Sequence, residues 1–115
     1  MAEESVINVS KSTNGPALVI SVSGKVDALT SPEFKKHLAD AVGQNPKVIC
    51  DMAGVTYISS AGVGALIENK NNAGKAGGDI VLCSLIPDVK KVFDLLGFSK
   101  FFKIYADQKE AVGKI

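Results

Sequence analysis

The feature that most constrains the fold is a pair of short apolar runs in the middle of the chain. Lys47 to Met52 and Asp79 to Ser84 each read as a strand that is buried on both faces. Such a strand needs helices packed above and below it, which is what strand-helix-strand crossovers provide. We therefore expect the first of these strands to lie at the centre of a sheet.

A hairpin is expected before the first apolar run. Val6 to Ser10 alternates between apolar and polar residues, and Ala17 to Gly24 reads as a second strand. Residues 12 to 16 are turn-prone, since they include Asn, Gly and Pro. The pattern therefore predicts two strands joined by a turn.

Three helical segments follow the hairpin or separate the later strands. The first spans residues 31 to 43, begins with a Ser or Thr cap and Pro32, and ends at a glycine. The second spans residues 60 to 73 and is rich in small residues, and the third opens at Pro87 and stops at Gly97. The inward faces expected for the first and third helices comprise Phe34, Leu38, Ala41, Val42, Val89, Val92, Phe93 and Leu96.

The remaining segments complete the order. A loop is expected at Ala53 and Gly54, followed by a β-leaning stretch over residues 55 to 58. A last strand is expected over residues 101 to 105, before a short helix from Asp107. Strands that alternate with helices imply right-handed crossovers. We predict an α/β fold with a mixed, largely parallel sheet of about five strands packed with about four helices.

Length and charge limit the function classes. One domain is expected over residues 1 to 115, because single domains usually run to ~100–200 residues. Thirteen Lys and Arg against twelve Asp and Glu give a net charge of +1, which offers no general attraction to nucleic acid or to an acidic membrane. The longest stretch without a polar side chain, residues 61 to 67, is far shorter than the roughly 20 residues that span a bilayer. Met1 to Glu4 does not resemble a secretory signal, so we expect a cytoplasmic protein without membrane insertion or direct nucleic-acid binding.

The cysteines and the histidine do not point to a metal site. Cys50 and Cys83 each lie within an apolar run and lack a CxxC partner, which favours buried, inert thiols. The single histidine, His37, lies within a helical pattern, so a histidine-rich metal site is excluded.

The stretch from Asp51 to Leu66 is the most unusual in the chain, because a strand ends there and serines and glycines open a helix. The first amide groups of a helix are unpaired, and the helix dipole favours negative charge near them. A serine at this position therefore serves as a cap, as part of an anion site or as an acceptor of phosphate. The spacing leaves the three hypotheses open.

Enzyme chemistry has little support in this stretch. It lacks the GxxxxGK[ST] arrangement of a phosphate-binding loop, so we exclude an intrinsic ATPase. Nucleophilic catalysis by Ser59 or Ser60 would need a base, and His37 has no triad spacing to recommend it. Ile58 also stands where a GxSxG elbow requires glycine. We therefore expect a protein that is not an enzyme.

Three further residues near this stretch have alternative interpretations. Gly62 and Gly64 cost the helix roughly 1 kcal/mol each relative to alanine, which indicates either close helix-to-sheet packing or close approach by another backbone. Asp27 either fixes the start of a helix or belongs to the same surface as Ser60. A nucleotide-binding module at the helix start is a third and weaker reading of the same residues.

Three blocks of residues resemble the STAS domain, and more narrowly the bacterial anti-sigma factor antagonists. Residues 24 to 31, GKVDALTS, resemble the G-x-hydrophobic-D stretch of that family. Residues 55 to 64, VTYISSAGVG, resemble its V-x-[FY]-[IM]-D-S-[STA]-G-[LV]-G signature, and residues 89 to 98 resemble its C-terminal helix. The resemblance covers nearly the whole chain and implies the α/β fold expected above.

The resemblance also implies a regulatory function without a cofactor. In the family, the serine after the acidic position of the signature is phosphorylated by a partner anti-sigma factor, which is an ATP-using serine kinase of the GHKL type. That serine corresponds to Ser60 here, and a serine phosphatase reverses the modification. The unphosphorylated protein binds the anti-sigma factor and frees the sigma factor. The positions expected to contact the partner by this resemblance are Gly24, Asp27, Ser59, Ser60, Ala61, Gly62 and Gly64.

One position, Ser59, departs from the signature. Ser59 replaces the usual acidic residue, which makes it a second candidate for phosphorylation, and Ala61 stands where a Ser or Thr often follows. An alternative function of a different class is a constitutive scaffold, such as a subunit of a lipid-transport ABC complex or a signalling assembly, that binds its partner without phosphorylation.

Overall fold

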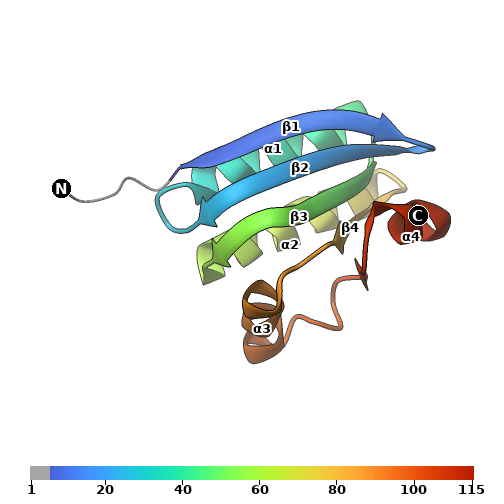
Figure 1. Ribbon diagram of the computed structural model, residues 1–115. Coiled ribbons are helices and arrows are strands. Elements are labelled where there is room, and N and C mark those ends of the chain that lie inside the picture. The colour runs from blue at the N-terminus through green and yellow to red at the C-terminus, as the bar shows by residue number, and fades with distance from the viewer. Residues whose placement is uncertain (1–5) are drawn as a thin grey trace.

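The computed structural model describes residues 6–115, and these residues form a five-stranded sheet in the order β1-β2-β3-β4-β5 (Figure 1). β1 pairs antiparallel with β2, and the other three pairings are parallel. The predicted mixed, largely parallel sheet with a central strand β3 is confirmed. The interpretation of Met1 to Glu4 falls outside the described residues. The strands are β1 (Ile7–Asn14), β2 (Ala17–Val26), β3 (Lys47–Ile58), β4 (Asp79–Cys83) and β5 (Ile104–Tyr105).

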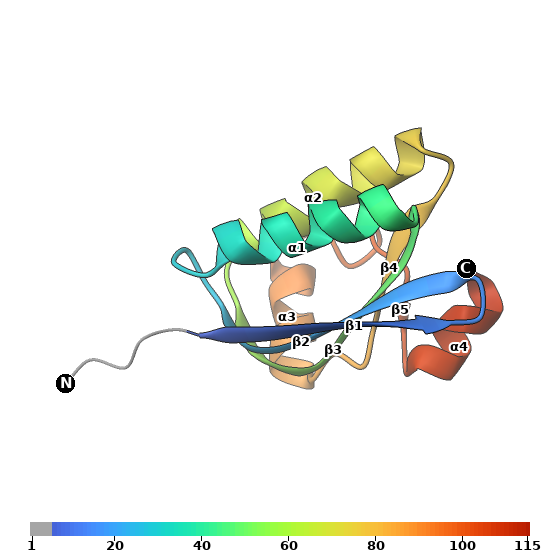
Figure 2. The same cartoon turned by 90° about the horizontal axis from the view of Figure 1, so that it is seen from above.

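The described chain has four helices, which cover the two faces of the sheet unequally. α1 and α2 lie side by side on one face (Figure 2), and their buried residues join those of α3 in the main core. α4 packs against the other face, where Ala111 joins Val19, Ile49 and Val81 in a smaller core. The helices are α1 (Ser31–Gln44), α2 (Ser60–Lys75), α3 (Pro87–Leu96) and α4 (Gln108–Lys114).

Local sequence signals account for several helix ends, but not for all of α1: its N-cap, Thr30, makes no side-chain capping hydrogen bond, and the helix continues through Gly43 to Gln44. Proline occupies the first turn of both α1 and α3, where its missing N–H removes no intrahelical bond. Gly97 ends α3 with φ of 78°, a left-handed conformation that glycine adopts without a steric penalty. Asp107 caps α4 by accepting a hydrogen bond from the backbone N–H of Glu110 at 2.9 Å. Within the expected inward faces, Leu96 is exposed, whereas Phe93 is fully buried.

The loop expected at Ala53 and Gly54 is wrong, because β3 continues through both residues as a single strand of 12 residues. Its pairing with β2 shifts register twice, and each shift inserts one extra residue into β3. Glycine is required within this strand, since a Cβ atom at Gly54 would lie 2.6 Å from the Cβ atom of Ser23. Ala53 and Gly54 therefore belong to a bulged strand rather than to a loop.

Two other strand boundaries differ from the prediction. β1 extends to Asn14 rather than Ser10, because its antiparallel register with β2 is unbroken up to the pair Asn14 and Ala17. β5 holds two residues instead of the five expected over 101 to 105. Phe102 is instead buried against Phe93, with ring centroids 5.5 Å apart in an edge-to-face arrangement. Packing of this aromatic side chain replaces strand pairing there.

The fold predicts a large stability loss when the contact of α1 with the sheet is removed. Phe34 is fully buried in the main core. We expect Phe34→Ala to lower the free energy of unfolding by about 3–5 kcal/mol in urea denaturation, because it leaves a cavity. Lys36→Ala changes an exposed residue of the same helix and should stay within about 0.5 kcal/mol of the unmodified protein. Equal losses in the two variants would contradict this packing.

Candidate functional site

Ser59 and Ser60, the serine pair at the start of α2, have different surroundings. Ser59 is the N-cap of the helix, and its hydroxyl oxygen accepts a hydrogen bond from the backbone N–H of Gly62 at 3.4 Å. Ser60 is the first helical residue and is exposed. The capping hypothesis therefore describes Ser59. Ser60 is thus an exposed residue at the end of the helix where the dipole favours negative charge.

Asp27 shapes the loop that leads from β2 into α1. One oxygen of its carboxylate accepts hydrogen bonds from the backbone N–H groups of Leu29 at 3.0 Å and Thr30 at 3.1 Å. The buried hydroxyl of Thr30 accepts from the backbone N–H of Asp27 at 3.0 Å and donates to the carbonyl of Lys25 at 2.7 Å. Asp27 therefore fixes the start of α1, the first of its two sequence interpretations.

A backbone hydrogen bond joins this loop to the start of α2. The N–H of Ser59 donates to the carbonyl oxygen of Val26 at 2.8 Å. β2 and β3 are parallel neighbours, so their carboxyl ends meet at one edge of the sheet. The structure thus brings Asp27 and the serine pair to the same edge, and the second interpretation of Asp27 is compatible with the first.

The glycines that the sequence assigned to this surface have different surroundings. A Cβ atom at Gly62 would lie 2.7 Å from both Ile58 Cγ1 and Val26 Cγ1, so this glycine lets α2 approach the sheet closely. Gly64 has open space around the same position and lines a groove between α1 and α2, together with Ala61. Gly24 has φ of 103°, and a Cβ atom there would collide with the carbonyl oxygen of Val6. Gly24 and Gly62 therefore have packing roles, whereas Ala61 and Gly64 are exposed.

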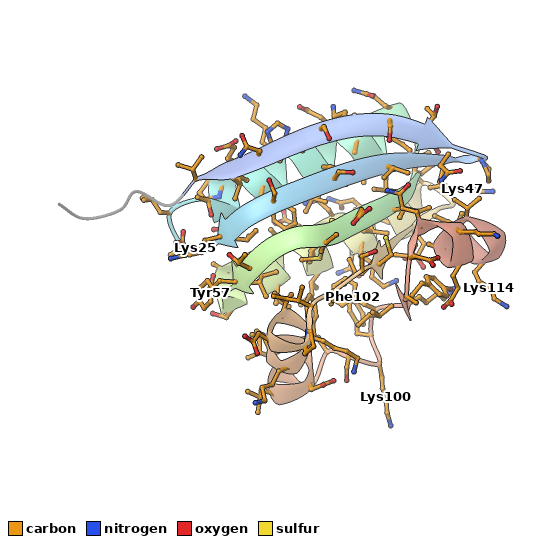
Figure 3. All side chains as sticks on the ribbon, in the orientation of Figure 1. Lys25, Lys47, Tyr57, Lys100, Phe102 and Lys114 are labelled. Atoms are coloured by element: carbon orange, nitrogen blue, oxygen red, sulfur yellow. The ribbon has the colours of Figure 1, made fainter. Side chains whose placement is uncertain are left out.

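Charged side chains around the site are solvated or paired. Lys35 of α1 and Glu68 of α2 form an ion pair of 2.9 Å across the groove, and both are about half exposed. Lys25 and Tyr57 pair in register near the carboxyl ends of β2 and β3, where Figure 3 shows them as neighbours. His37 lies on α1 with Nε2 3.6 Å from the carboxylate of Glu33. Among the described residues, no cluster of three His, Cys, Asp or Glu could hold a metal ion.

The sequence interpretation overlooked the apolar residues at this edge. Leu29 is 72% exposed and Tyr57 is 48% exposed. Leu29 precedes α1 and does not share the helical spacing of Phe34, Leu38 and Ala41, which is the signal that could have marked it as an outward-facing residue.

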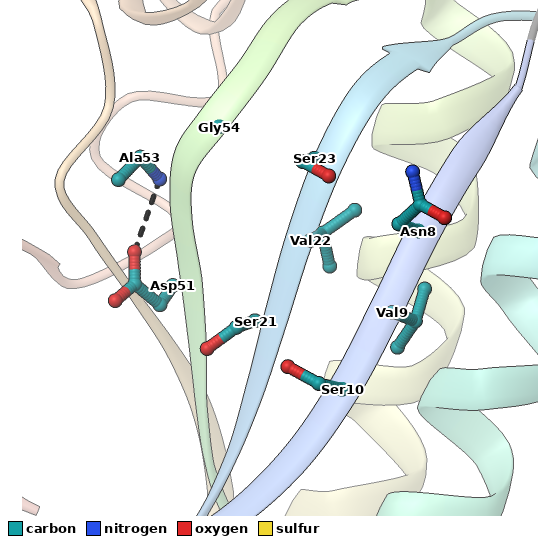
Figure 4. A pocket seen from close by; sticks show the side chains of 9 residues that line it. All are labelled: Asn8, Val9, Ser10, Ser21, Val22, Ser23, Asp51, Ala53 and Gly54. Carbon is teal, nitrogen blue, oxygen red and sulfur yellow. Dashed lines mark hydrogen bonds between the residues drawn. The ribbon is translucent and has the colours of Figure 1, made fainter.

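Besides the groove between α1 and α2, a pocket lies on the opposite face of the sheet (Figure 4). It is lined mainly by small polar side chains from β1, β2 and β3. Asp51 is its charged residue, and its carboxylate is engaged by two hydrogen bonds. One oxygen accepts from the backbone N–H of Ala53 at 3.0 Å, and the other accepts from the side chain of Gln108 at 2.6 Å. Asp51 therefore helps to hold α4 in place. The lining comprises Asn8, Val9, Ser10, Ser21, Val22, Ser23, Asp51, Ala53 and Gly54.

Both cysteines are fully buried, as the sequence predicts, and they belong to different cores. Burial raises the pKa of the Cys83 thiol to about 11 and raises the pKa of Cys50 further still. A raised thiol pKa keeps the reactive thiolate scarce at neutral pH. Neither side chain is therefore suited to nucleophilic or redox chemistry.

Gly62 and Gly64 of α2 predict opposite effects of the same substitution. We expect Gly62→Ala to lower the free energy of unfolding by about 1–3 kcal/mol, because its methyl group overlaps two buried side chains. Gly64→Ala should raise it by up to about 1 kcal/mol, because alanine favours the helix and has space. Chemical denaturation measures both, and a stabilised Gly62→Ala variant would contradict the close approach of α2.

The buried thiols predict a loss of stability in alkaline solution. Because the folded pKa of Cys83 lies above its ordinary value of 9.0, the folded protein holds this proton more tightly than the unfolded chain. The stabilisation is complete below about pH 9 and is lost as the pH rises through about 11. We expect Cys83→Ala to show a shallower decline of unfolding free energy over this range. An identical decline in both proteins would rule out this contribution.

Comparison with known proteins agrees with this architecture. The family model described as the STAS domain matches residues 8–111. A candidate anti-sigma factor antagonist of Bordetella bronchiseptica, BtrV, is 30% identical over 95 residues, which cover 82% of this chain and 81% of that protein.

Solved structures show the same fold at lower sequence identity. The crystal structure of an anti-sigma factor antagonist from Mycobacterium paratuberculosis has a TM-score of 0.85 and 24% identity, and the match covers 94% of this chain and 92% of that chain. The phosphorylated form of the Bacillus cell fate determinant SpoIIAA has a TM-score of 0.69 and 19% identity, with coverage of 95% and 98%. With a family model that spans nearly all of the described residues, this chain belongs to the STAS domain family and has anti-sigma factor antagonists among its relatives.

Proposed function

We propose that this protein is an anti-sigma factor antagonist that is switched off by phosphorylation of Ser60. Unphosphorylated protein binds an anti-sigma factor serine kinase of the GHKL type, and the bound sigma factor is released. The kinase then transfers phosphate from ATP to Ser60, and a serine phosphatase removes it. The protein is a binding partner and substrate in this scheme rather than an enzyme, and it acts in the cytoplasm, where ATP is available.

The observation that carries this proposal is the exposure of Ser60, whose side chain carries a hydroxyl, at the first position of α2. Ser59 is half-buried, and its hydroxyl oxygen is already engaged as the helix cap. Ser60 is therefore the better phosphate acceptor of the pair. The relative SpoIIAA, which has the same fold, has a structure in a phosphorylated form, in line with phosphorylation of this kind of domain.

The position of Ser60 also suits a switch in binding without unfolding. A phosphate adds about −1.5 to −2 charges, and the unpaired amide groups of the first turn of α2 favour a negative charge there. In an interface that fits the neutral hydroxyl, the same charge introduces repulsion and a desolvation cost. A coupling of about 3 kcal/mol would weaken partner binding roughly 150-fold.

The test is a phosphorylation assay with purified GHKL-type serine kinases that are encoded in the same genome. We expect Ser60→Ala to abolish phosphate incorporation and to retain kinase binding, because the substitution removes the acceptor oxygen alone. Ser59→Ala is the matched control and should still be phosphorylated. Intact-mass measurement of the incubated proteins gives the result. Phosphorylation of Ser60→Ala, but not of Ser59→Ala, would move the acceptor to Ser59.

Protein isolated from exponentially growing and from stressed cells provides a second check. One added phosphate on the peptide that contains Ser60, with an occupancy that varies with growth conditions, supports the switch. Absence of phosphate in all conditions would contradict it and would favour the constitutive scaffold.

A further inference from the structure

The large apolar side chains that are exposed in the described chain form two groups. Leu95, Leu96 and Phe101 belong to α3 and the loop that follows it. Val6, Leu29 and Tyr57 gather at the same end of the sheet as Ser60. Val6 precedes the first residue of β1, Ile7, which pairs with Gly24, and Tyr57 pairs with Lys25. Exposed apolar residues are unremarkable singly, but a gathering beside a candidate site indicates a contact surface.

Leu29 is the most exposed member of the group beside Ser60, at 72%. Its loop is nevertheless held firmly, because its own backbone N–H donates to the carboxylate of Asp27. The next residue, Thr30, is buried and hydrogen-bonded to backbone groups of Lys25 and Asp27. The loop therefore presents an apolar side chain to solvent on a fixed backbone, which lowers the entropy lost when a partner binds it.

The loop that carries Leu29 is also joined to the start of α2. The hydrogen bond of 2.8 Å from Ser59 N–H to the carbonyl of Val26 connects the residue before Ser60 to the residue before Asp27. A partner that reaches Ser60 therefore meets the loop that carries Leu29. Because this loop adjoins the proposed phosphorylation site, the partner that would cover Leu29 is the kinase that phosphorylates Ser60.

We propose that Leu29 is the apolar anchor for the anti-sigma factor kinase, and that Asp27 is a positioning residue that acts through Leu29. This inference rests on the proposed function, because the partner is the kinase that phosphorylates Ser60. The kinase would need an apolar pocket beside its active site to receive the leucine side chain. Leu29 then supplies affinity, whereas the charge state of Ser60 controls release.

The test compares two leucines of similar exposure. Leu29→Ala and Leu95→Ala remove the same atoms from side chains that are 72% and 80% exposed. The probe is the purified kinase that phosphorylates Ser60 in the assay above, titrated calorimetrically with a non-hydrolysable ATP analogue present. We expect Leu29→Ala to weaken binding at least about tenfold, because an interfacial leucine is lost, and Leu95→Ala to stay within about twofold.

Asp27 is tested by a double-mutant cycle. Asp27→Ala removes the acceptor for the N–H of Leu29, whereas Asp27→Asn keeps an oxygen in that place. We expect Asp27→Ala to weaken binding about as much as Leu29→Ala, but to add less than about twofold when Leu29 is already alanine. Asp27→Asn should bind nearly as well as the unmodified protein. Circular dichroism and thermal unfolding identify any variant that fails to fold, and Asp27→Asn then decides the role of Asp27.

The results that overturn the inference differ from those that overturn the proposed function. If Leu29→Ala binds within about twofold of the unmodified protein, or if Leu95→Ala is equally impaired, Leu29 is not the anchor. Additive effects of Asp27→Ala and Leu29→Ala, or weak binding by Asp27→Asn, show that Asp27 contacts the kinase directly. In each case the unmodified protein is still phosphorylated at Ser60. Failure of every kinase to phosphorylate the unmodified protein would instead reject the function itself.

Discussion

The burial of β3 on both faces is the constraint on which the rest of the fold depends. Val48, Cys50 and Met52 point into the core beneath α1 and α2, while Ile49 points into the smaller core beneath α4. Covering both faces requires helices on each side of the sheet, and parallel neighbours require crossovers long enough to hold them. α1, α2 and α3 lie in the connections between parallel neighbours and pack on one face, while α4 at the end of the chain covers the other. The N-termini of α1 and α2 therefore follow the carboxyl ends of β2 and β3, which places both helix starts at one edge.

That arrangement gives the site its electrostatic character without a charged cluster. Ser60 lies at the start of a 16-residue helix, and the Asp27 loop leads into the start of its neighbour. The N-termini of α1 and α2 thus give this edge of the sheet a partial positive charge, and the side chains at the edge determine which groups contact solvent. Ser59 satisfies part of the helix end, which leaves Ser60 exposed. The two neighbouring serines thus differ, since Ser59 caps the helix and Ser60 is exposed.

Much of the fold was predictable from the sequence because each element carried a local signal. The prolines in the first turns of α1 and α3, Gly97 after α3 and the two apolar runs identified elements that the structure contains. Predictions failed where tertiary packing overrode local preference. Gly54 looked like a loop residue but permits close contact with Ser23, and Phe102 looked like a strand residue but packs on Phe93.

For the site, the sequence pattern marked Asp27 and the serine pair but could not separate their roles. Both serines lie close enough to the start of the helix in the sequence to cap it. Only the hydrogen bond from the backbone N–H of Gly62 to the hydroxyl oxygen of Ser59 shows which one does. Leu29 was overlooked although it does not share the helical spacing of Phe34, Leu38 and Ala41. Its backbone N–H donates to Asp27 and the next residue, Thr30, is buried, and the sequence does not show these contacts.

The unequal lengths of β3 and β4 affect how the site responds to a partner. β4 pairs with β3 over Lys47–Asp51, so the last seven residues of β3 extend past that ladder and pair with β2 along one side. Backbone groups along the other side of this extension lack the cooperative protection that a strand within a sheet receives. The segment leading to Ser60 is therefore paired on one side only, whereas Lys47–Asp51 is paired on both sides. A partner that binds over this segment would shield backbone groups that β4 does not pair, and amide exchange along the segment would report occupancy of the site.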